Sequence, residues 1–138
     1  MNYLYSQKVL FQHCDPARIV FYPRYFEMLN ACIENWFEEK LGCSFADMHG
    51  VLNRGIPTVT INAEFHSPSY LGDILEFELN VTAMGRSSLD IKVEVTCESE
   101  ARVNFNQRIV FIDSESGRSC AWPESLITPL KIYLTENV

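Results

Sequence analysis

Residues 23–40 read PRYFEMLNACIENWFEEK, and this stretch decides the fold. Pro23 suits the first turn of a helix, and Gly42, shortly after the stretch ends, suits a left-handed C-terminal cap. The spacing predicts one long, heavily buried helix. Its large apolar residues recur every three or four positions: Tyr25, Phe26, Leu29, Ile33, Trp36 and Phe37.

After Gly55 the period of the apolar residues changes from helical spacing to alternation. Val59, Ile61, Ala63 and Phe65 alternate with polar residues, and similar rows follow between turns. This alternation is typical of half-buried antiparallel strands with one apolar face. Together with a short first strand before the helix, the expected strands cover residues 5–12, 58–65, 75–83, 89–97 and 102–113.

One long apolar helix and a sheet with one apolar face must bury each other. We therefore expect an α+β fold in which an antiparallel sheet of about five strands wraps around one central helix. The connection over 43–55 suggests a short helical turn at 44–49, and residues after Trp122 suggest a short terminal helix. No repeat or linker divides the 138 residues, so residues 1–138 are expected to form one domain.

Composition narrows the range of partners. The net charge of −7 disfavours nucleic acid, whose phosphates require a basic face. No apolar run approaches the roughly 20 residues that cross a bilayer, and the first residues lack an export signal, so no membrane partner is expected. Five cysteines, an odd number without C-x-x-C spacing, indicate reduced thiols and a cytoplasmic protein.

Several familiar kinds of site are missing from the sequence. The three histidines have no metal-ligand spacing with one another or with the cysteines, so no metal is expected. There is no G-x-S-x-G elbow and no Walker-type glycine loop, which excludes the usual serine hydrolases and P-loop nucleotidases. Cys14, beside His13, is interpreted as a small buried hydrophobe rather than a nucleophile.

Asp15 is the candidate for chemistry. It lies in an irregular segment, 13–22, directly before the long helix. An aspartate before Pro16 commonly caps a turn, and this structural role is one interpretation. The other is catalytic, because a carboxylate can act as nucleophile or general base while a helix N-terminus stabilises a developing oxyanion.

Several segments resemble a known family. The run CDPA at 14–17, Ile19-Val20 and FYPRY at 21–25 are similar to the N-terminal signature of the 4-hydroxybenzoyl-CoA thioesterase family, which includes thioesterases encoded beside bacterial Tol–Pal genes. The resemblance continues through the turn at 67–73 and the run GRSSL at 85–89. It covers roughly residues 7–113, and the Asp-Pro-Ala segment is its most specific part.

The resemblance implies a hotdog fold, sheet-edge dimers and often tetramers, and a small-molecule acyl-CoA substrate without a cofactor. It implies that Asp15 carries hydrolysis and that the backbone N–H of Tyr22, at the helix start with Pro23, polarises the thioester carbonyl. The run of Arg86, Ser87 and Ser88 would contact the phosphates or pantetheine of CoA. The alternative interpretation of Arg86 is a solvated turn residue.

Three positions depart from the family pattern. Arg18 stands where the family usually has glycine, so it must tolerate a left-handed backbone or reshape the loop, and its charge could reach the CoA phosphates. Pro23 replaces a frequent histidine, which places the chain nearer the aromatic-acyl branch. Asn30 falls where the hydroxybenzoyl enzyme has an acid that reads the phenol, and it is neutral.

The leading hypothesis is therefore hydrolysis of acyl-CoA thioesters to a carboxylic acid and CoA, with a short-chain or aromatic acyl group. Two alternatives remain open. An acyl-carrier-protein thioesterase would need a basic docking face, which a charge of −7 disfavours. A non-catalytic acyl-CoA-binding module is kept open by Arg18. A sheet with open edges predicts at least a homodimer. The resemblance implies that a homotetramer is the other expected assembly.

Overall fold

The computed structural model describes residues 1–135. Its helices are α1 (Pro23–Glu39), α2 (Phe45–His49) and α3 (Glu124–Ile132), with a single 3-10 turn, η1 (Phe11–His13). Its strands are β1 (Tyr3–Lys8), β2 (Arg54–Gly55), β3 (Thr58–Phe65), β4 (Ile74–Met84), β5 (Ser88–Cys97), β6 (Glu100–Val110) and β7 (Ile112–Asp113). Of the helices in this range, none combines the length and the hydropathy that a membrane crossing requires.

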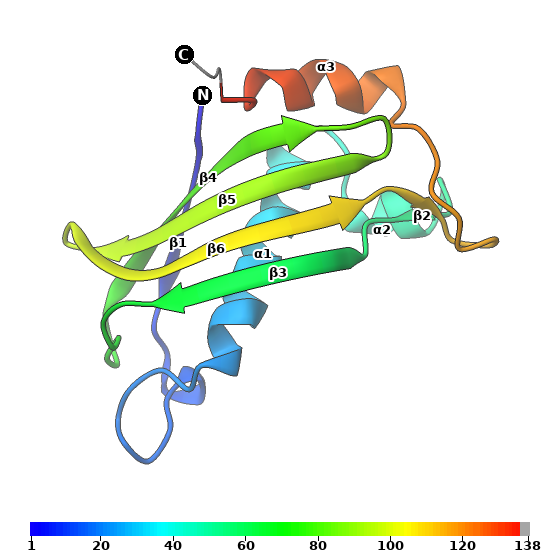
Figure 1. Ribbon diagram of the computed structural model, residues 1–138. Coiled ribbons are helices and arrows are strands. Elements are labelled where there is room, and N and C mark those ends of the chain that lie inside the picture. The colour runs from blue at the N-terminus through cyan, green and yellow to red at the C-terminus, as the bar shows by residue number, and fades with distance from the viewer. Residues whose placement is uncertain (136–138) are drawn as a thin grey trace.

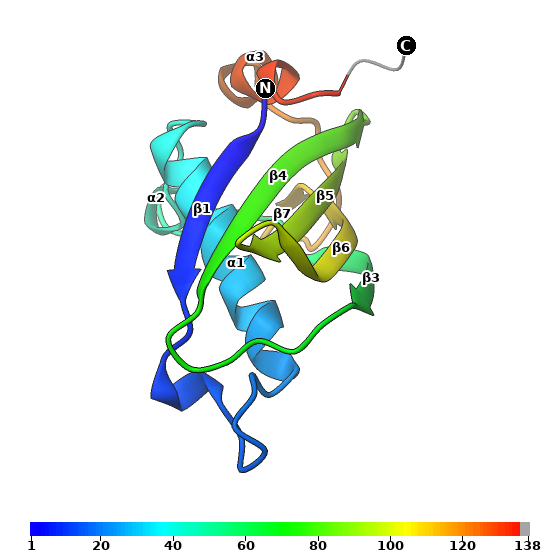
Figure 2. The ribbon, with the colours of Figure 1, turned by 90° about the vertical axis from the view of Figure 1, so that its left-hand side faces the viewer.

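A five-stranded antiparallel sheet forms the main layer, in the order β1-β4-β5-β6-β3. Helix α1 lies along its inner face, and α3 covers one end of it (Figure 1 and Figure 2). Strands β2 and β7 pair separately as a small two-stranded sheet. The expected α+β arrangement of about five strands around one central helix is confirmed.

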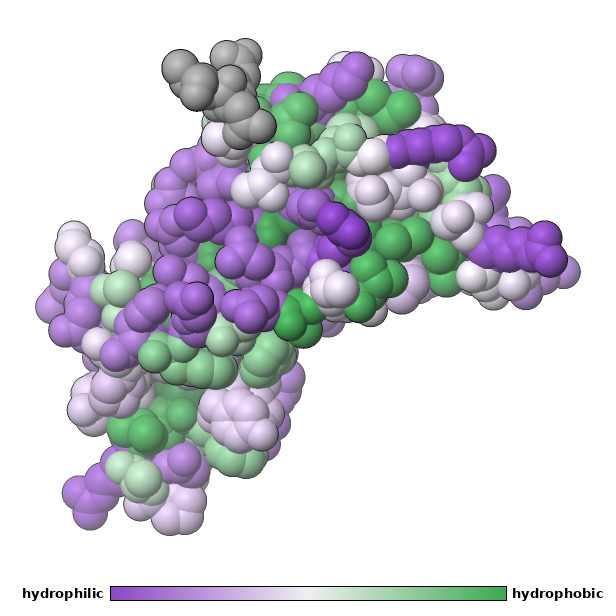
Figure 3. All heavy atoms as spheres, viewed as in Figure 1, coloured by the Kyte–Doolittle hydropathy of each residue, from purple (hydrophilic) through white to green (hydrophobic). Residues whose placement is uncertain are grey.

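The core lies between α1 and the inner rows of the sheet. Large side chains of α1, including Leu29, Trp36 and Phe37, are almost completely buried there. The outer face carries the polar members of each alternating row, and Figure 3 shows hydrophilic residues gathered over its middle. Alternation places every second strand residue on the inner face, so the same period that predicted the strands also builds the core.

The predicted start of α1 is confirmed, and the helix ends at Glu39, one residue before the predicted Lys40. The helix begins at Pro23, and Gly42 has a φ of +71°, the left-handed conformation expected of its cap. The turn expected at 44–49 forms as α2, where the Ser44 side chain accepts a hydrogen bond from the Asp47 N–H. The terminal helix expected after Trp122 forms as α3.

The prediction for the first strand was wrong at both ends. Strand β1 runs from Tyr3 to Lys8, not over 5–12. Lys8 pairs with Ile74, the first residue of β4. Val9 then bonds through its backbone to Asp73 and Gly72 in the turn before β4, so the regular ladder ends here. The chain then turns into η1.

Two other details of the strands differ from the prediction. The last strand, expected over 102–113, is divided into β6 and β7. A β-bulge between Val81 and Ala83 shifts the register of β4, so Ala83 is exposed rather than turned inward. A bulge inserts one extra residue and reverses the faces that follow it.

The apolar row of β3 is not buried. Val59, Ile61 and Phe65 are 53%, 42% and 49% exposed, although the alternation predicts that they face the core. Strand β3 is an edge strand, and among residues 1–135 only β6 pairs with it. The molecule therefore has an open sheet edge with an uncovered apolar row beside it.

Candidate active site

Asp15 lies at the start of a tight loop that closes on itself. Its N–H donates to the Ile19 carbonyl over 3.0 Å, and its own carbonyl accepts from the Arg18 N–H over 2.8 Å. Its Oδ1 accepts a hydrogen bond from the Ala17 N–H over 2.8 Å. The turn-capping role is therefore present. It uses one carboxylate oxygen, and Oδ2 has no hydrogen-bond partner within residues 1–135.

Arg18 adopts the left-handed conformation that the family glycine implies. Its φ is +69°, and its side chain is exposed. A non-glycine residue is strained in this region by roughly 1–2 kcal/mol. The loop thus keeps its shape with an arginine in place, and the guanidinium extends into solvent. Cys14, expected to be buried, is partly exposed in the same loop.

The N-terminus of α1 offers one free backbone donor. Pro23 has no N–H, while the N–H groups of Arg24 and Tyr25 donate to the carbonyls of Phe21 and Tyr22. Across the described chain, the Tyr22 N–H forms no hydrogen bond. This donor stands at the positive end of the helix dipole, which suits an oxyanion.

A cavity of about 320 Å³ opens beside this donor. Its walls include Tyr22, Tyr25 and Phe65, and the rings of Tyr22 and Phe65 meet edge to face with centroids 6.3 Å apart. The cavity therefore adjoins the C-terminal end of β3. Aromatic walls of this kind accept a flat apolar group.

A buried network holds this region to the sheet. The Arg102 guanidinium on β6 donates from Nη1 to Asp73 Oδ2 over 2.7 Å and to Ser69 Oγ over 3.2 Å. The Ser69 carbonyl accepts from the Val20 N–H over 2.9 Å, and the Ser69 hydroxyl accepts from Tyr25 Oη. Loop 13–22 and the first turn of α1 are thus both attached to one serine.

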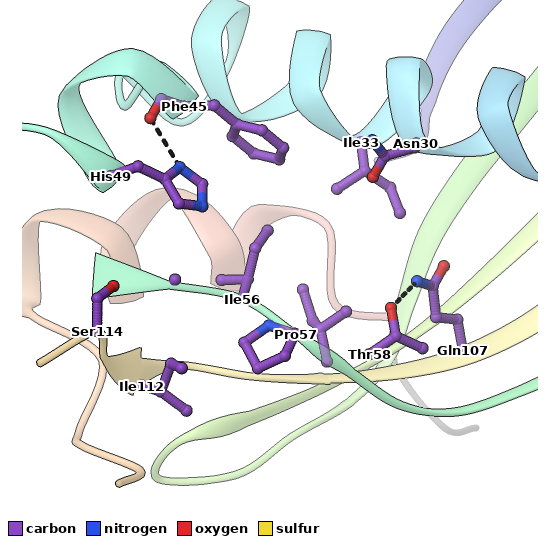
Figure 4. A pocket seen from close by; sticks show the side chains of 12 residues that line it. Asn30, Ile33, Phe45, His49, Ile56, Pro57, Thr58, Gln107, Ile112 and Ser114 are labelled. Carbon is purple, nitrogen blue, oxygen red and sulfur yellow. Dashed lines mark hydrogen bonds between the residues drawn. The ribbon is translucent and has the colours of Figure 1, made fainter. Parts of the chain in front are cut away.

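A larger cavity of about 510 Å³ lies farther along α1, between that helix, α2 and the start of β3 (Figure 4). Asn30, the residue predicted to read the acyl group, lines it from α1. Gln107 on β6 faces the same space and donates from Nε2 to Thr58 Oγ1 over 2.7 Å. On the opposite side, His49 Nδ1 lies 2.8 Å from the Phe45 carbonyl oxygen.

The sequence interpretation missed Gln107, Thr58 and His49 as site residues. A usable signal existed for Gln107, because it interrupts the apolar inner row of β6 with an amide. Thr58 and His49 carry no such signal, since ordinary strands and helices contain both. No group of three or more metal-ligating side chains gathers within residues 1–135.

Arg86, Ser87 and Ser88 lie far from Asp15 in the same chain. They follow the end of β4, whereas loop 13–22 contacts the turn before β4, where the Val20 N–H binds Ser69. The eleven residues of β4 rise about 3.3 Å each, which separates the two regions by roughly 30 Å or more. Figure 1 shows them at opposite ends of the sheet. The predicted site residues are therefore not gathered within one chain.

The turn at 85–88 is instead attached to the C-terminal segment. The Arg86 carbonyl accepts from the Trp122 N–H over 3.0 Å, and the Ser87 carbonyl accepts from the Phe111 N–H over 2.7 Å. The Trp122 indole Nε1–H donates to the Ser88 carbonyl. These bonds use the backbone, and the Arg86 side chain stays exposed.

The family model of the thioesterase-like superfamily matches residues 9–130. The chain belongs to this superfamily. It is 25% identical over 135 residues to the 1,4-dihydroxy-2-naphthoyl-CoA hydrolase of Prochlorococcus marinus (strain MIT 9313), with 91% of this chain and 87% of that protein covered. It is 34% identical over 87 residues to the 4-hydroxybenzoyl-CoA thioesterase of Pseudomonas sp. (strain CBS-3), with 60% of each chain covered.

Among solved structures, a 1,4-dihydroxy-2-naphthoyl-CoA thioesterase from Synechocystis has a TM-score of 0.87 at 18% identity, with 95% of this chain and 96% of that chain covered. This likeness confirms the hotdog fold. The family resemblance found in the sequence is confirmed as well, and the protein is a thioester hydrolase by family.

Proposed function

We propose that this thioesterase hydrolyses acyl-CoA esters of aromatic acids, releasing the free acid and CoA. The observation that carries the proposal is that one short loop holds both the Asp15 carboxylate and the Tyr22 N–H, which has no hydrogen-bond partner within residues 1–135. Two relatives named for CoA esters of hydroxylated aromatic acids support the aromatic acyl group. The aromatic walls of the cavity beside Tyr22 also favour it.

In the proposed reaction the thioester carbonyl oxygen accepts a hydrogen bond from the Tyr22 N–H. Asp15, as general base, takes a proton from water, and the resulting hydroxide attacks the carbonyl carbon. The negative charge that develops on the oxygen is stabilised by the same N–H and by the helix dipole. The carbon–sulfur bond then breaks, and the proton passes to the CoA sulfur. Pro23 contributes by starting the helix without a second, competing N–H.

Direct attack by Asp15 is the alternative course. The carboxylate would form an acyl-aspartyl anhydride and release CoA thiolate, and water would then cleave the anhydride. Both courses need a free carboxylate oxygen, which Oδ2 supplies, and both use the Tyr22 N–H for the oxyanion.

We further propose that the working unit is a homodimer formed through β3. An open strand edge needs a partner or a cover, and the exposed row of Val59, Ile61 and Phe65 needs an apolar neighbour. Antiparallel pairing of β3 with a second copy meets both needs. A homotetramer built on the outer sheet face is less favoured, because that face carries the exposed ion pair of Arg108 with Asp90.

This dimer would also complete the site. Tyr22 lies at the Phe65 end of β3, and the larger cavity lies at the Thr58 end. Antiparallel pairing of two β3 strands brings the Phe65 end of one copy to the Thr58 end of the other. The thioester at Tyr22 of one chain would then extend its acyl group toward the partner's larger cavity.

The nucleotide portion of CoA carries several phosphates. Arg18, exposed beside Asp15, is the nearest candidate to contact them, and Arg86 of a neighbouring copy is a second. We place the protein in the cytoplasm, where five free cysteines remain reduced. The net charge of −7 favours CoA over an acidic carrier protein as the acyl donor.

The test is thiol release from a panel of aromatic, short-chain and long-chain acyl-CoAs. Asp15→Asn is expected to lower kcat by about 10²- to 10⁴-fold. Glu124→Gln, which alters an exposed acid on α3, serves as the control and is expected to keep full activity. Full activity of Asp15→Asn, or no turnover of any acyl-CoA by the wild type, contradicts the proposal.

The dimer is tested by light scattering with Ile61→Glu, which places a charge in the exposed apolar row. We expect a monomer with little activity. Thr60→Glu, on the outward side of the same strand, should remain dimeric and active. A wild-type monomer at micromolar concentration contradicts the dimer.

A further inference from the structure

Gln107 is an exception in the inner row of β6. The other members of this row, Val103, Phe105 and Ile109, are at most 1% exposed and apolar. An amide among them must find hydrogen-bond partners, because a buried polar group without one is unfavourable. Gln107 lies where a leucine or methionine would complete the core.

Only one end of this amide has a partner. Nε2 donates to Thr58 Oγ1 over 2.7 Å, and Oε1 is buried without a partner within residues 1–135. Exchanging the two ends of the amide does not remove the problem. The threonine hydroxyl can donate as well as accept, so it satisfies one end in either orientation and leaves the other free.

Oε1 itself is covered, but the Gln107 side chain that carries it borders open space. Gln107, Thr58 and Asn30 line both the cavity of about 510 Å³ and an adjoining one of about 310 Å³. The remaining walls include the apolar side chains of Phe26, Ile33 and Ile56. A few convergent polar groups in a mostly apolar cavity are typical of a specific ligand site.

Pairing of two β3 strands places this amide opposite the reacting carbonyl. Gln107 is bonded to Thr58 at the first residue of β3, and the Tyr22 ring packs against Phe65 at the last. In the dimer proposed above, these ends belong to different copies and meet. An aromatic ring attached to a thioester at Tyr22 would therefore point toward the partner's Gln107.

We propose that Gln107 is a specificity-determining residue, whose free amide end forms a hydrogen bond with a hydroxyl group on the acyl ring. This inference rests on the proposed function and names the residue that selects the substrate. A hydroxyl suits the site because it can donate to the amide oxygen or accept from the amide nitrogen. A ring without it leaves the amide end unpaired, which raises the barrier for that substrate.

The experiment compares benzoyl-CoA with its 2-, 3- and 4-hydroxy derivatives. The wild type should hydrolyse at least one hydroxylated ester with a kcat/KM tenfold or more above that of benzoyl-CoA. Gln107→Met, which keeps the volume and removes the amide, should reduce this preference about tenfold. It should leave kcat/KM for benzoyl-CoA unchanged or higher. Asn106→Met, on the outer face of the same strand, is the matched control and should keep the wild-type preference.

Thermal unfolding provides a second measurement that does not depend on activity. Gln107→Met removes a buried unpaired group, so its Tm should equal or exceed that of the wild type. If Gln107→Met folds and hydrolyses acyl-CoAs with the wild-type preference, the inference is overturned while the proposed function stands. The inference is overturned in the same way if the wild type hydrolyses acyl-CoAs without favouring any hydroxylated ester. A different result, full activity of Asp15→Asn, would contradict the proposed function itself.

Discussion

Tyr25 Oη donates a hydrogen bond to Ser69 Oγ over 2.9 Å, and both groups are buried. The two residues are separated by 44 positions in the chain and join the first turn of α1 to the turn before β4. Because the Ser69 carbonyl also binds the Val20 N–H, this contact fixes the distance between the helix start and loop 13–22. The proposed oxyanion donor and the proposed carboxylate are thus positioned by the same serine.

Tyr25→Phe removes only the hydroxyl from this arrangement. We expect a loss of about 1 kcal/mol in the free energy of unfolding, the usual effect of one hydrogen bond. We expect kcat to fall more than KM changes, because the donor at the helix start shifts relative to Asp15. Denaturant unfolding and steady-state kinetics measure the two effects. Tyr5→Phe, whose hydroxyl contacts Gln7 at a partly exposed position, is the control.

Asp73 makes stability depend on pH in the acid range. Burial alone raises the pKa of Asp73, but the hydrogen bond from the Tyr70 N–H and the Arg102 guanidinium outweigh it and hold that pKa below its usual range. A carboxyl whose pKa is lowered by folding stabilises the protein above its unfolded pKa. That stability is lost as the pH falls through the folded pKa.

Asp73→Asn should therefore lower the free energy of unfolding by about 2 kcal/mol at pH 7. It should also flatten the decline of stability between pH 5 and pH 2. Glu94→Gln, which disrupts the exposed Lys92–Glu94 pair, should change stability by less than about 1 kcal/mol. Equal losses from the two variants would contradict the buried character of the Arg102–Asp73 pair.

His13 also makes stability depend on pH, in a range nearer to neutral pH. Its Nδ1 accepts the Leu10 N–H over 2.8 Å, so the ring must stay neutral to keep this bond. Burial lowers the pKa of His13, Glu27 partly opposes this, and Arg24 lowers the pKa further. The stabilisation is complete above the unfolded pKa of about 6.5 and is lost as the pH falls through the lower folded value.

Unfolding measured between pH 7.5 and pH 5 should show this loss in the wild type. His13→Asn offers an acceptor near the position of Nδ1 but does not titrate, so its stability should vary less over the same range. An NMR titration of the imidazole reads the pKa directly. A midpoint at or above 6.5 in the folded protein would contradict the prediction.

Arg18→Gly separates backbone strain from binding. Glycine relieves the left-handed strain, although it adds freedom to the unfolded chain, so we expect a net gain of about 0.5 kcal/mol in stability. If the guanidinium contacts the CoA phosphates, KM for acyl-CoA should rise several-fold at low salt. KM for a pantetheine thioester, which lacks the nucleotide phosphates, should not change. Arg118→Gly, at an exposed turn, is the control.

The helix and most strands could be predicted because their signals are local. Period and caps fix α1 within one residue, and alternation identifies β4, β5 and β6. The end of β1 could not be predicted, since it depends on where β4 begins, 66 positions away from Lys8 at Ile74. The exposure of the β3 row also depends on the order of the strands in the sheet, which no local pattern specifies.

In the candidate site, too, the residues with local signals could be predicted and the others could not. Asp15 and Tyr22 lie in one short segment, so a motif can identify both. Gln107 can be recognised as a site residue only from its hydrogen bond with Thr58, 49 positions away, and from a cavity that forms only after folding. The turn of Arg86, Ser87 and Ser88 matches the family pattern, yet in a single chain it lies at the far end of the sheet from Asp15.

The uncovered edge of β3 has a consequence for how the protein is made. A newly folded chain that has not met a partner presents unpaired N–H and C=O groups together with Val59 and Ile61. Such an edge accepts other extended segments, including those of unfolded neighbours, and can seed aggregation. If two chains pair through β3 as proposed, correct pairing and mispairing compete for the same edge during biosynthesis. Yield on expression should then depend on how quickly chains find each other, as well as on how stably each one folds.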